Sequence, residues 1–186
     1  MKTAHAWLVA TAAVVAMSAA HAEKARLATS MGDIVVDLDR ARAPATVENF
    51  VQYVKAGHYD GTVFHRVIDG FMIQGGGMTS DMAEKPTRAP IALESRNGLT
   101  NVRGSIAMAR TMDPNSATAQ FFINVKDNPP LDAANSRDGN GYAVFGKVVD
   151  GMATVDKIRV VATGTRGRHA NVPVEPVVIR KATVEK

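Results

Sequence analysis

Residues 64–76 are the part of this chain whose types and order are best suited to chemistry. They read Phe-His-Arg-Val-Ile-Asp-Gly-Phe-Met-Ile-Gln-Gly-Gly, which sets one arginine and one glutamine among large apolar side chains. No nucleophile in this run is paired with a base, so it is poorly suited to hydrolysis. An arginine among apolar residues can instead hold an uncharged group and donate a hydrogen bond to it, because the guanidinium stays charged and donates rigidly.

The alternation of side chains along a strand indicates which candidate residues can meet. Successive side chains of a strand point to opposite faces of the sheet. In a strand over residues 62–68, Arg66 shares a face with Phe64, whereas His65 takes the other face. We therefore expect His65 to be a structural histidine that faces away from Arg66.

Two further expected strands can add side chains to the face that carries Arg66. Met72 and Gln74 share one face of residues 71–74, and Gln120 and Phe122 share one face of residues 120–125. The sequence thus permits these four side chains and Arg66 to line one exposed patch.

The elements that must position these residues are two helices among many short strands. Residues 25–39 read as a hairpin whose turn needs Gly32 at a positive φ, and residues 44–57 read as a helix that starts at Pro44 and stops at Gly57. Residues 152–158 suit a second helix. Alternation predicts strands over residues 62–68, 71–74, 105–109, 120–125, 142–149 and 174–183. Without regular alternation of strand and helix, this order favours an antiparallel barrel over a parallel sheet.

Four segments, in this order along the chain, resemble the cyclophilin family of peptidyl-prolyl cis-trans isomerases. They are residues 64–76, residues 103–109 (Arg-Gly-Ser-Ile-Ala-Met-Ala), residues 116–124 around Gln-Phe-Phe-Ile, and residues 143–148 (Ala-Val-Phe-Gly-Lys-Val). The opening hairpin and the 44–57 helix are also similar to the family. The resemblance implies a mainly β fold, a closed antiparallel eight-stranded β-barrel with two capping α-helices.

The resemblance also implies roles for ten residues. Arg66 matches the catalytic arginine, and Gln74 matches the side chain that helps to orient it and the substrate. The residues that match the walls of the family's pocket for the proline ring are Phe71, Met72, Phe122 and Leu131. The residues that match positions in contact with the segment before proline are Ala109, Arg110 and Gln120, where Arg110 would act mainly through its backbone. Tyr142 stands where many members carry a histidine beside the prolyl ring. Such an isomerase requires no metal, nucleotide or other cofactor.

The first 22 residues have the pattern of a cleaved secretory signal. Lys2 is followed by an apolar, alanine-rich run, and Ala20-His21-Ala22 offers a cleavage site. The run is shorter than the ~20 residues that a membrane-spanning helix needs, which disfavours the alternative of an anchor. We expect residues 23–186 to form one isomerase domain that is exported, and periplasmic if the source is a Gram-negative bacterium, with no membrane association after cleavage.

Composition excludes some classes of function. The chain has no cysteine, so it carries neither disulfides nor thiol chemistry. Its 22 Lys and Arg stand against 18 Asp and Glu, and the basic stretch at residues 159–169 has no interleaved aromatic residues. We therefore expect no nucleic-acid partner and regard this stretch as a solvated surface. The expected partners are proline-containing unfolded or folding polypeptides, and the protein is expected to be a monomer.

Other interpretations of these residues remain open at this point. Arg66 could be a structural arginine paired with a carboxylate, and the apolar candidates could be ordinary core. The glycines at 75–77 could cradle a phosphate, although they lack the spacing of a phosphate loop. Ser105, His65 and Asp69 could form a triad, although no nucleophile elbow surrounds Ser105. The whole protein could also bind proline-containing segments without turnover.

The loop at residues 126–141 departs from the family pattern. Pro130 stands near the position where members that bind cyclosporin strongly carry a tryptophan. We therefore expect weak binding of cyclosporin.

Overall fold

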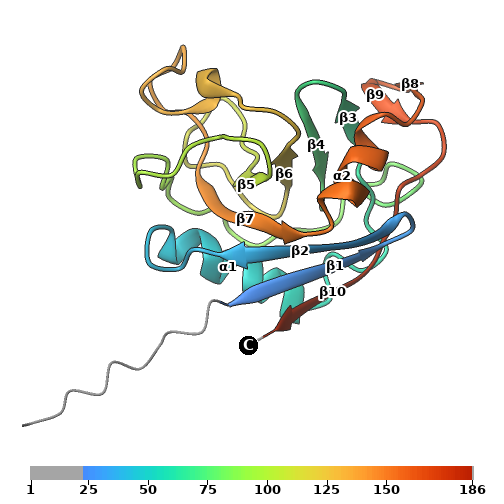
Figure 1. Ribbon diagram of the computed structural model, residues 1–186, viewed down its shortest axis with the longest axis horizontal. Helices are drawn as coiled ribbons and strands as arrows, with labels where there is room; N and C mark the ends of the chain where they lie inside the picture. Colours follow the sequence, from blue (N-terminus) through green and yellow to red (C-terminus); the bar gives the residue numbers. More distant parts are fainter. Residues whose placement is uncertain (1–22, 186) are drawn as a thin grey trace, which may run out of the picture.

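The computed structural model describes residues 23–185, so the expected signal at residues 1–22 lies outside the described residues (Figure 1). The helices are α1 (Pro44–Lys55) and α2 (Met152–Arg159), with a short 3-10 turn η1 (Pro129–Leu131). The strands are β1 (Lys24–Thr29), β2 (Gly32–Leu38), β3 (Arg66–Ile68), β4 (Met72–Gly75), β5 (Ser105–Met108), β6 (Phe121–Asn124), β7 (Val144–Asp150), β8 (Thr163–Arg166), β9 (His169–Pro173) and β10 (Ile179–Glu185).

The predicted opening hairpin is confirmed as β1 and β2. The two strands pair up to Thr29 opposite Gly32, and Gly32 has a φ of 127°, which an L side chain rarely adopts. The Thr29 hydroxyl donates to the Gly32 carbonyl and accepts from the Met31 N–H at 3.1 Å. These bonds fix the turn and therefore the register of the first two strands.

Eight strands form one antiparallel sheet in the order β10-β1-β2-β7-β5-β6-β4-β3. The mainly β architecture with two helices is confirmed, but the sheet is a curled half-barrel, and the closed barrel that we expected is not confirmed. Among the described residues, the regions beside the two edge strands, β3 and β10, are linked by one isolated bridge between Val63 and Val178 and by a few neighbouring hydrogen bonds, such as that from the Gly61 N–H to the Ile179 carbonyl at 2.8 Å. Closure would require a continuous ladder there, because only full pairing removes sheet edges.

Helix α1 covers the large core of the sheet. Pro44 opens it as expected, and the carboxylate of Glu94 accepts hydrogen bonds from the N–H groups of Ala45 (3.1 Å) and Thr46 (2.8 Å), which otherwise lack partners at a helix start. The side chains spaced along its inner face are all buried, as predicted: Val47, Phe50, Val51 and Val54. The ring of Phe50 packs edge-on against Phe121 of β6 at 5.7 Å between centroids, so α1 supports the back of the strand that reaches the site.

The predicted helix at 152–158 is confirmed as α2, but two predicted strands were wrong in extent. The strand over 62–68 shortens to β3, because residues 62–65 form isolated bridges and irregular backbone instead of a ladder. The strand over 174–183 begins only at Ile179. Before it, residues 163–173 form the hairpin β8–β9, which turns at Gly167 with a φ of 60° and includes part of the basic stretch at 159–169.

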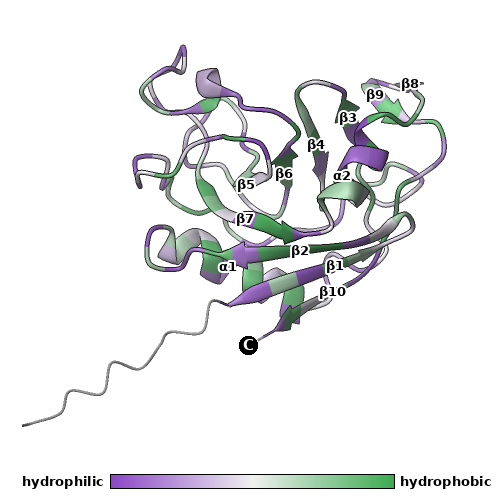
Figure 2. Cartoon of the chain, viewed as in Figure 1, coloured by the Kyte–Doolittle hydropathy of each residue, from purple (hydrophilic) through white to green (hydrophobic). Residues whose placement is uncertain are grey.

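Hydropathy follows this arrangement. Figure 2 shows apolar residues along much of β7 and hydrophilic residues in the loops at the edge of the molecule. Within residues 23–185, none of the helices has the length and the apolar character needed to cross a membrane.

Candidate functional site

All ten residues that the sequence assigned to the site line one pocket of about 680 Å³. It lies where β3, β4 and β6 meet the loops that follow β5 and η1. The predicted residues in its lining are Arg66, Phe71, Met72, Gln74, Ala109, Arg110, Gln120, Phe122, Leu131 and Tyr142.

The polar wall of the pocket is built by strand register. Arg66 pairs with Gln74 across β3 and β4, and Gln74 pairs with Phe122 across β4 and β6. The Arg66 Nη1 donates to Gln74 Oε1 at 3.3 Å, and Gln74 Nε2 donates to Gln120 Oε1 at 2.9 Å. This chain of bonds orients the amide of Gln74 and, through it, the guanidinium.

Arg66 keeps donors available for a ligand. Its side chain is half-buried, and it forms no ion pair among the described residues. The alternative of a structural arginine paired with a carboxylate is therefore not what the structure shows. A guanidinium has five N–H donors, and Gln74 takes only one of them.

Glycines let the polar wall assemble closely. Gly76 has a φ of 83°, and a Cβ on Gly77 would overlap the side chain of Gln120, lying 2.7 Å from its Nε2. Residues 75–77 thus serve tight-turn geometry, as the sequence predicts, and they also allow a close approach, because only hydrogen fits beside Gln120.

The apolar wall is a small cluster separate from the large core under α1. Met72, Ala107, Phe122 and Val144 are its buried members, and partly buried Phe71, Ala109, Leu131 and Tyr142 pack against it, together with Ile68 and Leu99. The rings of Phe122 and Tyr142 meet edge-on at 5.5 Å between centroids. The apolar candidates are therefore not part of the main core, and their exposed edges offer a site for an apolar ring.

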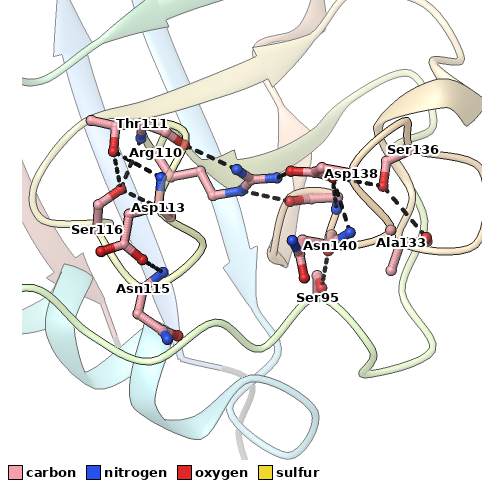
Figure 3. A network of polar contacts seen from close by, with 12 residues as sticks. Ser95, Arg110, Thr111, Asp113, Asn115, Ser116, Ala133, Ser136, Asp138 and Asn140 are labelled. Carbon is pink, nitrogen blue, oxygen red and sulfur yellow. Dashed lines mark hydrogen bonds and ion pairs between the residues drawn. The ribbon is translucent and has the colours of Figure 1, made fainter.

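Arg110 holds the loop side of the pocket, as Figure 3 shows. Its guanidinium donates to the carbonyls of Gly141 and Thr111, both at 2.9 Å, and pairs with the carboxylate of Asp138. The guanidinium carbon also lies 4.7 Å from the centre of the Tyr142 ring. Because this side chain is 4% exposed and each of its three nitrogens donates a hydrogen bond within the protein, the backbone of Arg110 is the part that can meet a ligand.

Asp138 is a residue of the site that the sequence did not reveal. It accepts hydrogen bonds from the N–H groups of Asn140 and Gly141 as well as from Arg110, and these bonds hold the pKa of its carboxyl well below the usual range. It lies in the 126–141 loop, which departs from the family pattern and is outside the four segments that carry the resemblance, so no signal in the sequence marked it.

The prediction that His65 faces away from Arg66 is wrong. His65 lines the same pocket, is 5% exposed, and its Nδ1 has no hydrogen-bond partner among the described residues. Alternation failed because β3 begins only at Arg66, so His65 lies in irregular backbone. Burial, followed by the proximity of His169, lowers the pKa of His65 to about 4, so the ring is neutral at pH 7.

The hairpin β8–β9 completes the rim. Strand β9 packs beside β3, and Arg168, His169, Ala170 and Asn171 line the pocket together with Met78 from another loop. The sequence showed the basic stretch at 159–169, but it gave no indication that this stretch folds back beside Arg66.

Ser105, His65 and Asp69 do not form a catalytic triad in the structure. The Ser105 hydroxyl donates to the Val102 carbonyl at 2.7 Å and accepts from Asn124 at 2.9 Å, and Asp69 pairs with Arg159. Within residues 23–185 no three His, Asp or Glu side chains lie close enough together to hold a metal ion. The pocket can therefore bind an apolar ring and direct hydrogen bonds at it, but it offers no nucleophile beside a base.

A larger hollow of about 940 Å³ lies elsewhere, between the end of β2, β7 and residues 98–102. None of the ten predicted residues lines it. Size alone does not mark a site, and the smaller pocket is the one in which polar donors converge on an apolar wall.

Comparisons with known proteins agree with this geometry. Residues 24–184 match the sequence model of the cyclophilin-type peptidyl-prolyl cis-trans isomerases. A peptidyl-prolyl cis-trans isomerase of Streptomyces antibioticus is 58% identical over 159 residues, covering 85% of this chain and 96% of that protein. Isomerase B of Escherichia coli is 55% identical over 159 residues, covering 85% and 97%. A Cryptosporidium parvum cyclophilin, crystallised in the presence of the dipeptide Ala-Pro, superposes with a TM-score of 0.70 at 25% identity, covering 88% of this chain and 99% of that one.

Proposed function

The chain belongs to the cyclophilin family and is thereby a peptidyl-prolyl cis-trans isomerase; from this premise, we propose that Arg66 catalyses the rotation by a hydrogen bond to the prolyl nitrogen. Its substrates are proline-containing polypeptides. The observation that carries the proposal is an arginine without an ion pair among the described residues, oriented by Gln74 beside an apolar wall.

The reaction needs stabilisation of a twisted amide. Resonance gives the peptide C–N bond double-bond character and a rotation barrier of ~18–20 kcal/mol. At the twisted transition state the prolyl nitrogen becomes pyramidal and regains its lone pair. A donor directed at that nitrogen forms a bond that strengthens only as resonance is lost, so it binds the transition state more tightly than the ground state.

One hydrogen bond does not account for a fast isomerase. A hydrogen bond to a charged group contributes about 1.5–3 kcal/mol, which is roughly one to two decades in rate. We propose that the wall of Met72, Phe122 and Leu131 holds the proline ring while the preceding residues turn, and that it also removes water from the rotating bond.

The rival function is a binding module that holds proline-containing segments without turnover. Simple binding of an apolar ring gains nothing from a cation, because burying a charge beside apolar groups costs free energy. The polar chain from Arg66 through Gln74 to Gln120 therefore favours catalysis over binding alone.

Export forms a second part of the proposal. The pattern of residues 1–22 supports a secreted precursor, from which cleavage after Ala22 would release the domain at residues 23–186, acting as a monomer on folding exported proteins. N-terminal sequencing of the protein recovered from its cells is expected to give Glu23 first. Recovery of a mature protein that still contains Trp7 would contradict cleavage.

The catalytic role is tested by isomerisation of a proline peptide, measured with wild type and with Arg66→Ala. We expect a loss of well over tenfold in kcat/KM, by the magnitude of one charge-assisted hydrogen bond, with an unchanged circular dichroism spectrum. Arg66→Lys, which keeps the charge but not the rigid fork, should recover only part of the activity. Wild-type turnover in Arg66→Ala would refute the role. Cyclosporin titrated into the same assay is expected to give no nanomolar inhibition.

A further inference from the structure

We propose that the hairpin β8–β9 gives the pocket a cationic subsite, centred on Arg168, that favours substrates with a carboxylate side chain next to the proline. The inference rests on the proposed function, since it names a class of substrate for the same site. It concerns the hairpin that the sequence marked only as a basic surface stretch.

The hairpin is attached to the molecule beside the catalytic strand, so its side chains are presented to the pocket. Figure 1 shows β9 next to β3, and these two strands are in contact. Val172 and Pro173 are buried at the base of β9, whereas the Arg166 guanidinium donates to the Ser80 carbonyl at 2.6 Å. Between these attachments, the exposed Arg168 reaches the pocket lining.

The charge around the pocket is one-sided. Its lining contains three arginines, at positions 66, 110 and 168, and no aspartate or glutamate among the described residues. Asp138 neutralises Arg110 from behind the wall. Neither Arg66 nor Arg168 forms an ion pair within residues 23–185, so two positive charges border the pocket without a protein carboxylate paired to either of them.

A peptide carboxylate beside the proline would supply the missing charge. His65 does not add to the positive charge at neutral pH, because burial lowers its pKa to about 4. An ion pair with an exposed side chain such as Arg168 changes an association constant by up to about fivefold, and salt weakens this attraction by screening. Attraction of this kind selects substrates and accelerates their encounter without altering the chemistry of rotation.

The test compares matched blocked peptides that differ only in the residue beside the proline. Alanine, glutamate or lysine is placed directly before or directly after it, and kcat/KM is measured at low salt and at about 1 M salt. For wild type we expect glutamate to exceed alanine by about threefold to fivefold in at least one position, and the ratio to fall toward one at high salt.

Two variants of Arg168 and one control assign the preference to the hairpin. Arg168→Gln should bring the glutamate-to-alanine ratio close to one, and Arg168→Glu should shift the preference toward lysine. Arg180→Gln removes the same charge from an exposed position on β10 outside the pocket lining and should keep the wild-type ratio.

Three outcomes would overturn the inference: a wild-type ratio near one in both positions, a ratio that Arg168 variants leave unchanged, or a ratio that Arg180→Gln abolishes equally. In each of these the alanine peptide still reports isomerisation, so the proposed function stands. Absence of turnover on the alanine peptide by wild type would instead refute the proposed function itself.

Discussion

Two walls of the pocket hold their side chains in different ways. The sheet wall, which consists of residues 65–77 and 120–122, takes its geometry from the backbone ladders of β3, β4 and β6. The loop wall, which consists of residues 109–116 and 131–142, contains no strand or helix apart from the last residue of η1. Each of these two described segments has backbone hydrogen bonds of its own, such as that from the Tyr142 N–H to the Leu131 carbonyl at 2.9 Å, but none runs between them, and the side chain of Arg110 joins the two segments. Figure 3 shows the two segments of the loop wall meeting at the pair of Arg110 and Asp138.

Because of this difference, we expect the two walls to respond differently to amino-acid substitutions. Ladder hydrogen bonds do not depend on which side chains the strands carry, so the sheet wall keeps its backbone when one side chain is altered. The loop wall has no comparable support, because its segments are joined through a few side-chain bonds. We therefore expect changes in the sheet wall to act on individual groups, and changes in the loop wall to act on several residues together.

The first prediction is that His65, in the sheet wall, makes the free energy of unfolding fall as the pH is lowered. Folding holds this ring neutral down to a pKa of about 4, whereas an unfolded histidine binds a proton below about pH 6.5. The unfolded state therefore binds more protons, and wild type should lose about 2 kcal/mol of stability through His65 as the pH falls from 7 to 5.

Denaturant unfolding of His65→Gln at several pH values tests this expectation. The variant should lose less stability on acidification than wild type, although burial also lowers the pKa of His58, so part of the slope should remain. If the free energy of unfolding fell equally with pH in both proteins, His65 would not be the group responsible for the loss of stability.

The next effect concerns the close approach of Gly77 to Gln120. In Gly77→Ala the new Cβ displaces the side chain of Gln120, so its bond to Gln74 is lost while the backbone ladder remains. We expect kcat/KM to fall by roughly threefold to tenfold, the worth of one neutral hydrogen bond, with little change in Tm.

Gly164→Ala on β8 is the matched control, since a Cβ there meets nothing within 4 Å and its backbone φ is not positive. It should retain wild-type activity. If Gly77→Ala were equally active, the orientation of Gln74 would not depend on Gln120, and the sheet wall would act through Arg66 alone.

The smallest effect concerns the Arg110–Asp138 pair in the loop wall. Asp138→Asn removes the negative charge that pairs with Arg110, so Tyr142 and the neighbouring loop should be held less firmly. We expect kcat/KM to fall by about threefold, mainly through KM. Asp113→Asn is the control, because that carboxylate accepts from the Asn115 N–H at 2.9 Å and does not contact Arg110.

The pH dependence of Asp138→Asn tests whether the Asp138 carboxylate is the group that holds the loop wall. The pKa of Asp138 is lowered by the Asn140 N–H and by Arg110, so its contribution is present above the ordinary aspartate pKa of about 3.9 and is lost only below that value. The difference in activity between wild type and Asp138→Asn should therefore persist from pH 7 to about pH 4. A difference that vanished by pH 5 would indicate that another group holds the loop wall.

The positions of site residues could be predicted where a family motif lies within a regular strand, because side-chain alternation then indicates which face each residue takes. Gln74 and Phe122 lie in regular strands, and the structure places both as their alternation requires. His65 was misplaced for the opposite reason, because alternation was applied to a residue that lies outside a ladder. Asp138 and Arg168 could not be predicted, since loop residues bring no periodicity that would indicate what they contact.

The resemblance to cyclophilins indicated the family and ten of the residues that line the pocket, and periodicity indicated most of the strands. It also indicated the helices predicted at 44–57 and 152–158, which the structure places at 44–55 and 152–159. These features are local, because they follow from periodicity, from glycine and proline positions and from contiguous motifs. Three features became visible only in three dimensions: the sheet is a curled half-barrel, His65 lines the pocket, and the β8–β9 hairpin brings Arg168 to the pocket rim. Those outcomes depend on contacts between residues a hundred or more positions apart, such as β3 with β9 and β1 with β10, and no local pattern encodes them.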